Sequence, residues 1–146
     1  MRNRPLFPLT RMAGAHWGMA RTVTLPHPHL IWLRSAATLL ISAVIGQAGF
    51  AAAAIGRDKS YFLFHAIGAG VTLTLGIASA ICYTVLRRTA GPVLLWLAWA
   101  TAAAIIVQFV LGKLEIADAH IFLGVLIAML ATALTSWTYR HPAPAE

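Results

Sequence analysis

Four long segments that lack any charged residue constrain this chain more than any other feature of its sequence. They cover residues 35–56, 60–86, 89–112 and 119–139, and none contains Asp, Glu, Lys or Arg. The hydrocarbon core of a bilayer is about 30 Å thick, and roughly 20 helical residues cross it. Because lipid offers no partner to an open backbone amide or carbonyl, such segments are expected to be helices. The sequence therefore predicts an all-α fold, an integral membrane four-helix bundle.

The composition agrees with a membrane protein. Of the 146 residues, 60% are hydrophobic and 10% are charged, whereas soluble domains carry about 25% charged residues. Mean hydropathy is +0.77. We expect two helical hairpins, between a basic, loosely ordered tail and a short C-terminal tail, with Met12 and Met19 as alternative starts. The predicted boundaries are 1–29 for the first tail, 31–56, 60–87, 91–113 and 117–139 for the helices, and 140–146 for the second tail.

The distribution of basic residues predicts the orientation. Most of the eleven Lys and Arg residues fall before the first span, between the second and third, or after the fourth, as Arg34, Arg87, Arg88 and Arg140 illustrate. The positive-inside rule then places both termini in the cytoplasm of a bacterial cell, with the chain in the inner membrane. This topology accounts for the net charge of +7, so we expect no nucleic-acid partner. The single cysteine, Cys82, excludes an internal disulfide and is expected to be a small buried hydrophobe.

Two histidines, His65 and His120, are the candidate functional residues. Each opens an even-numbered span and heads a stripe of small residues at helical spacing, with Gly68 following the first and Gly124 the second. Ionisable residues within membrane spans are rare and are functional candidates by default. Neutral imidazole is a good ligand for iron, and axial histidine is common in haem proteins. We therefore predict that the two histidines bind b-type haem as axial iron ligands, with the two glycines leaving room for the macrocycle.

A glutamine precedes each histidine, which suggests an internal repeat of two hairpins. Gln47 ends the first span before His65, and Gln108 ends the third before His120. Both histidines then lie near the same, outer face, and the Gln108 side chain is expected to bond a propionate, a histidine ring nitrogen or a backbone carbonyl. The sequence suggests that the two histidines lie at different depths in the membrane. His65 lies six residues beyond Lys59, about 9 Å of helical rise, whereas His120 lies only two residues beyond Asp118, about 3 Å. A shared iron requires staggered helices or an Asp118 set below the surface.

Two stretches resemble a known family. "QFVLGKLEIADAHIFLGVLIAMLATAL" is similar to the third-to-fourth-helix segment in one half of haem A synthase, and "FHAIGAG" to its second-helix histidine. The resemblance covers roughly residues 35–138, one four-helix half where the synthase has two. The chain is also similar to small four-helix bacterial membrane proteins of unassigned function with a histidine on helices two and four. Both resemblances imply axial haem ligation by His65 and His120.

The chain departs from the synthase at positions that serve its chemistry. The synthase has a carboxylate three residues before its second-helix histidine and commonly an arginine just after it, but this chain has Phe62 and Ala66 there. The cysteine pair found in the outer loop of many synthases has no counterpart. These departures argue against an enzyme and against oxidative haem chemistry, and they leave haem binding or electron transfer as the predicted role.

Two other functions fit the sequence. The histidines could simply pack within a cofactor-free structural or accessory protein. A small transporter or quinone-site subunit is also compatible, although Asp58, Glu115 and Asp118 fall in loops rather than forming an acidic relay. Besides the lipid bilayer, the partners we expect are a second copy of the chain, in a homodimer, or a larger respiratory or haem-related membrane complex.

Overall fold

The computed structural model of this chain describes residues 27–142, and those residues form four helices joined by short turns. The helices are α1 (Pro28–Gly56), α2 (Tyr61–Val85), α3 (Arg87–Lys113) and α4 (Ala117–Arg140). All four are long and apolar enough to cross a membrane, and the described residues contain no strand. The predicted all-α four-helix membrane bundle is confirmed. Almost all of the predicted basic tail, residues 1–26, lies outside the described residues, as do residues 143–146.

Two helix starts differ from the prediction for reasons of local backbone chemistry. Pro28 and His29, placed by the prediction in the tail, already belong to α1, because a proline fits the first turn of a helix, where its missing N–H is not needed. The third helix was predicted from residue 91, but a helical turn begins at Arg87. The chain kinks at Gly91, whose φ of 75° suits glycine, and Pro92 then starts the straight part of α3.

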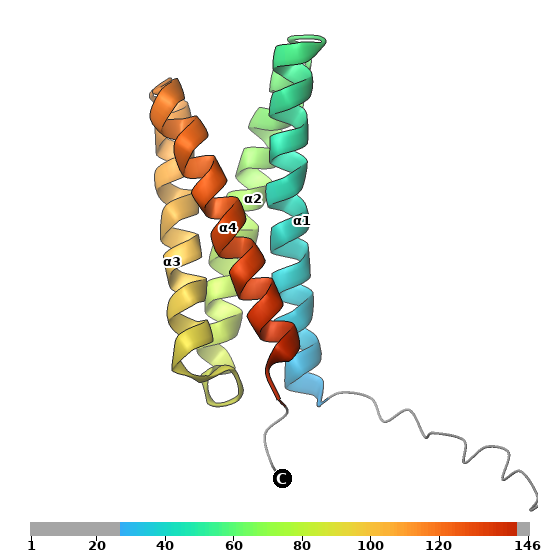
Figure 1. The fold of residues 1–146 in the computed structure, drawn as a ribbon, viewed down its shortest axis with the longest axis vertical. Helices are drawn as coiled ribbons and strands as arrows, with labels where there is room; N and C mark the ends of the chain where they lie inside the picture. Colours follow the sequence, from blue (N-terminus) through green and yellow to red (C-terminus); the bar gives the residue numbers. More distant parts are fainter. Residues whose placement is uncertain (1–26, 143–146) are drawn as a thin grey trace, which may run out of the picture.

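The helices follow one another around a ring. Each of α1 and α3 contacts both α2 and α4, whereas α2 and α4 lie diagonally across the bundle. Figure 1 shows that the described chain ends lie at one end of the bundle, together with the α2–α3 turn. We call this the terminal end. The turns within the two hairpins, α1–α2 and α3–α4, lie at the other end, the loop end (Figure 1).

The tightly packed core occupies the terminal half of the bundle. Its largest fully buried side chains include Leu33, Leu40, Leu94, Leu134 and Tyr83, whose hydroxyl bonds Thr138 on the diagonal helix. Toward the loop end, no residue before Thr72 in α2 or before Ile127 in α4 is buried, and none after Ile105 in α3. In α1 only Ala54 is buried beyond Val44. In Figure 1 the two hairpins diverge in this half. The loop half is therefore less tightly packed than the terminal half.

The two hairpins repeat one pattern of burial. Four of the five buried residues in α2 have a buried counterpart 55 positions later in α4, the separation that also relates Tyr83 to Thr138; the counterpart of the fifth, Ala80, is the half-buried Thr135. A second constant spacing relates α1 to α3. Parallel repeats of this kind are related by a two-fold axis along the membrane normal. The matched pairs are Thr72/Ile127, Gly76/Ala131, Ser79/Leu134, Tyr83/Thr138, Leu33/Leu94, Ala37/Ala98, Leu40/Thr101 and Val44/Ile105.

The packing of the terminal half predicts which substitutions by alanine will lower the stability of the protein. Leu134→Ala removes a side chain with 0% exposure and leaves a cavity, so we expect it to lower the free energy of unfolding by about 2–4 kcal/mol. Leu63→Ala makes the same change at a side chain that is 63% exposed toward lipid, and serves as the control. Unfolding of the detergent-solubilised variants measures both effects. Equal losses in the two variants would contradict this assignment of the core.

Candidate functional site

His65 lies in the first turns of α2 and is anchored to the preceding helix. The turn before α2 is organised by Asp58, whose carboxylate accepts a 2.8 Å hydrogen bond from the Ser60 amide. The half-buried imidazole of His65 places Nδ1 at 3.1 Å from the backbone carbonyl oxygen of Gln47 in α1. A carbonyl only accepts hydrogen bonds, so Nδ1 donates and carries the proton of the neutral ring. The lone pair of Nε2 is then available to a ligand.

His120 repeats this arrangement in the second hairpin. It lies in the first turn of α4, it is half-buried, and its Nδ1 donates to the backbone carbonyl oxygen of Gln108 in α3 at 3.1 Å. The equal distances and equal acceptors make the two histidines counterparts under the internal repeat. Both rings therefore have the same tautomer, with a lone pair on Nε2.

The two imidazoles meet across the bundle. Their ring centroids are 6.1 Å apart and the ring planes are inclined at 75°. The difference in depth that the sequence suggested is absent, because the helix starts compensate for it. Lys59 and Ser60 precede α2, whereas Asp118 already belongs to α4, so His65 and His120 are the fifth and fourth residues of their helices. The two histidines, far apart in the chain, form one pair at one level.

The separation of the rings has a chemical meaning. One metal atom held by two imidazoles needs two metal–nitrogen bonds of about 2 Å and two ring radii of about 1.2 Å, or about 6.4 Å between centroids. The observed 6.1 Å is close to this value. A backbone carbonyl that accepts from the other ring nitrogen is the usual outer-shell partner of a metal-bound histidine. The pair has the spacing and the tautomers of two axial ligands.

Within residues 27–142, no cluster of three or more His, Cys, Asp or Glu residues could hold a metal ion. The pair therefore offers two ligands and no third from these residue types. This excludes, for the described chain, the closed four-ligand site of the kind that binds structural zinc. Two ligands are sufficient only for a metal that brings other ligands with it.

The glutamine side chains border the histidine pair. The Oε1 atoms of Gln47 and Gln108 are both buried and without a hydrogen-bond partner in the described residues. A buried polar atom without a partner is costly, and polar sites that await a ligand are one place where such atoms occur. Their Nε2 atoms approach the glycines of the opposite helix in each hairpin. A Cβ on Gly68 would lie 2.0 Å from Nε2 of Gln47, and one on Gly124 would lie 3.2 Å from Nε2 of Gln108.

These contacts change how the predicted site residues are understood. Gly68 and Gly124 make room for glutamine side chains, where the sequence suggested room for a macrocycle. The main-chain carbonyl of Gln108 accepts the hydrogen bond from His120, and the bond predicted between its side chain and a propionate stays a prediction. Two further residues join the site. Gln47 is detectable in the sequence through the repeat, and Gly112 lies so close to His120 that a Cβ there would be 3.0 Å from the ring.

Other histidines lie at the terminal end and serve as ties between helices. His29 Nδ1 is 3.1 Å from the Thr89 hydroxyl oxygen, and His141 Nε2 is 2.8 Å from the Thr89 backbone carbonyl oxygen. His27 and His29 form an edge-on pair, with Nδ1 of His27 accepting from the His29 amide. These bonds join the start of α1 and the end of α4 to the start of α3.

No protein-family model, curated protein or solved structure matches this chain. The resemblance to haem A synthase stays a prediction from the sequence. Function is therefore inferred from the geometry of the histidine pair.

The contacts of the glycines generate a prediction. Gly68→Ala adds a methyl group where Gln47 Nε2 lies, whereas Gly70→Ala on the same helix meets nothing within 4 Å. Alanine raises helix propensity by about 1 kcal/mol over glycine, so we expect Gly70→Ala to match or exceed the wild-type stability. Gly68→Ala is expected to be about 1–2 kcal/mol less stable than Gly70→Ala, because the buried carboxamide must move. Thermal unfolding in detergent compares the two variants, and equal stability would show that the carboxamide is free to move.

Proposed function

We propose that this chain binds b-type haem, with His65 and His120 as the two axial ligands of its iron. One observation carries the proposal: two imidazoles from different hairpins lie with centroids 6.1 Å apart, each with Nδ1 held by a carbonyl. That leaves an Nε2 lone pair on each ring for the iron. Neutral imidazole ligation of this kind is a standard way in which proteins hold haem.

The ligand count favours haem over a bare metal ion. A porphyrin supplies four in-plane nitrogens, so the protein needs to provide only the two axial ligands, and the described site provides two histidines. The position of the pair also suits a large apolar group. It lies in the less tightly packed loop half, on the diagonal between α2 and α4.

The proposed role is electron transfer or haem binding rather than catalysis. If His65 and His120 both bound the iron of a haem, the group would supply electron transfer and would leave no position at the iron for a substrate. The chain's own residues orient the rings through the backbone carbonyls of Gln47 and Gln108. Phe62 and Ala66, at the positions where haem A synthase has a carboxylate and commonly an arginine, offer no acid or base beside His65.

The proposed location is the bacterial inner membrane, with the haem near its outer face. The terminal end carries Arg34, Arg87, Arg88 and Arg140, and the loop end carries Asp58, Glu115 and Asp118 together with three basic residues. This asymmetry favours a cytoplasmic terminal end. The histidine pair, close to the loop end, then faces the periplasm, where a redox partner or a second copy of the chain would exchange electrons with it.

Absorption spectroscopy tests the proposal. Protein purified in detergent from haem-replete cells is expected to give a reduced-minus-oxidised difference spectrum of a b-type haem. His65→Ala and His120→Ala are each expected to abolish or shift it, because each removes one axial ligand. His29→Ala, which removes an imidazole at the terminal end, is the matched control and should leave the spectrum unchanged. Colourless wild-type protein would refute haem binding and support a cofactor-free structural role.

A ligand exchange gives a second test that does not depend on losing the haem. In His120→Met the thioether replaces one imidazole, and histidine–methionine ligation raises the reduction potential relative to two histidines. We expect the midpoint potential to rise by at least about 100 mV, within the roughly 0.8 V range that axial ligands span. Redox titration of the retained haem measures it. A haem whose potential is unchanged in this variant is not bound through His120.

A further inference from the structure

The internal repeat relates two surface grooves near the terminal end that are far from the histidine pair. The α1/α4 groove has a volume of about 440 Å³, and the α2/α3 groove about 250 Å³. The first is lined by Ile31, Arg34, Ser35, Thr38, Leu39 and Tyr139, and the second by Thr84, Leu95, Trp96 and Trp99.

A side-chain hydrogen bond between equivalent positions joins the two helices at each groove. Thr38 and Tyr139 join their hydroxyl groups across α1 and α4 at 2.9 Å, and Trp99 donates to Thr84 across α3 and α2 at 3.0 Å. Trp99 occupies the position of Thr38 in the repeat, and Thr84 the position of Tyr139. The two grooves are therefore counterparts, and a difference between them reflects divergence of the side chains on one framework.

The side chains at equivalent positions of the two grooves differ in polarity. Leu95 and Trp96 fill the α2/α3 groove with apolar side chains, and their counterparts in the α1/α4 groove are Arg34 and Ser35. The α1/α4 groove therefore has an arginine and a serine where the α2/α3 groove has a leucine and a tryptophan. It is also the larger of the two grooves, about 440 Å³ against about 250 Å³.

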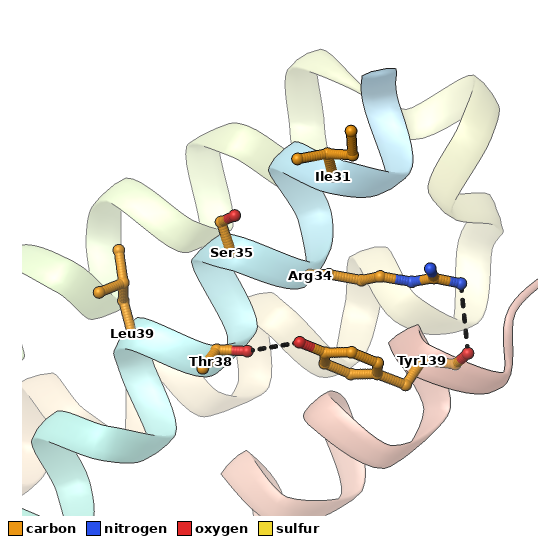
Figure 2. Close-up of a pocket in the computed structure, with 6 residues that line it drawn as sticks. All are labelled: Ile31, Arg34, Ser35, Thr38, Leu39 and Tyr139. Carbon is orange, nitrogen blue, oxygen red and sulfur yellow. Dashed lines mark hydrogen bonds between the residues drawn. The ribbon is translucent and has the colours of Figure 1, made fainter. Parts of the chain in front are cut away.

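The Arg34 guanidinium has N–H groups that make no hydrogen bond within the described residues. In Figure 2 it extends across the groove toward Tyr139, where Nη2 donates to the backbone carbonyl oxygen at 3.3 Å. Its central carbon lies 5.4 Å from the centroid of the Tyr139 ring. Nε is buried and has no partner in the described residues. Arginine presents five N–H donors in a planar fork that suits a phosphate.

The described chain offers this cation no anion. Its carboxylates are Asp58, Glu115 and Asp118, and all three lie at the loop end. A half-buried charge without a partner is unfavourable, so an external anion would stabilise Arg34. The apolar side chains of Ile31 and Leu39 flank the polar part of the groove and are exposed.

We propose that the α1/α4 groove binds an anionic phospholipid of the leaflet at the terminal end, with its phosphate on Arg34 and an acyl chain along Ile31 and Leu39. The exposed Trp32 and Trp137 side chains on the same two helices mark this level as a membrane interface, where headgroups lie. Basic pockets between membrane helices recognise anionic headgroups in this way. A zwitterionic lipid gains less, because no carboxylate at this end of the described chain receives its ammonium group.

Native mass spectrometry of the detergent-purified protein tests this proposal with defined lipids. We expect phosphatidylglycerol to bind about five- to tenfold more tightly than phosphatidylcholine, as one arginine–headgroup contact of roughly 1 kcal/mol predicts. Arg34→Gln should remove that preference. Lys113→Gln, which removes one positive charge at the loop end, is the control and should keep it.

A second variant tests the groove without changing its charge. Ser35→Trp combined with Thr38→Trp introduces the two tryptophans of the α2/α3 groove at the equivalent positions, and should block phosphatidylglycerol while keeping Arg34. Thermal unfolding verifies that each variant is folded. Equal binding of the two lipids, or equal losses in Arg34→Gln and Lys113→Gln, would overturn the proposal. So would displacement of the lipid by millimolar inorganic phosphate, because the groove would then be an anion site without lipid specificity.

Discussion

The hydrogen bond from a histidine Nδ1 to a glutamine carbonyl is the contact on which the site depends. It occurs once in each hairpin, at 3.1 Å in both, and it joins the second helix of the hairpin to the first. The bond fixes the tautomer of each neutral ring, leaves the lone pair on Nε2 and ties the ring to the neighbouring helix. Because a main-chain carbonyl is the acceptor, the anchor moves only if the helix itself moves. Because each hairpin has one such hydrogen bond at an equivalent position, the two imidazoles lie at the same depth in the bundle.

The division of the bundle into two halves follows from the residues on the inner faces. Near the terminal end, small and branched apolar side chains interdigitate, and hydroxyl groups such as those of Tyr83 and Thr138 bond across the bundle. Near the loop end the inner faces carry Gln, His and Gly, which cannot close a dry apolar core without a partner for each polar atom. The packed half supplies rigidity, and the other half holds the candidate site.

Much of the fold was predictable because lipid imposes a length on an apolar helix, and the four charge-free segments satisfy it. The pairing of His65 with His120 was predictable from the repeat, but their common depth was not. It depends on whether Asp118 lies before or within a helix, and apolar length does not determine a helix start to within two residues. The main-chain hydrogen bond of Gln108 was not predicted, for a different reason. Main-chain acceptors have no sequence signature, so only coordinates distinguish the carbonyl of Gln108 from its side chain.

The histidine pair lies on the two-fold axis of the repeat, whereas the grooves lie off it. The two hairpins therefore share one histidine site but have two separate grooves. The histidines lie across the axis from each other, so residues of both hairpins form one site, and a change in either hairpin alters that site. The two grooves lie off the axis, and each is formed by its own pair of helices. Nothing physical couples Arg34 to Leu95, or Ser35 to Trp96. At the histidine pair the equivalent residues are identical, His65 with His120 and Gln47 with Gln108, whereas at the grooves the equivalent residues differ in charge and polarity.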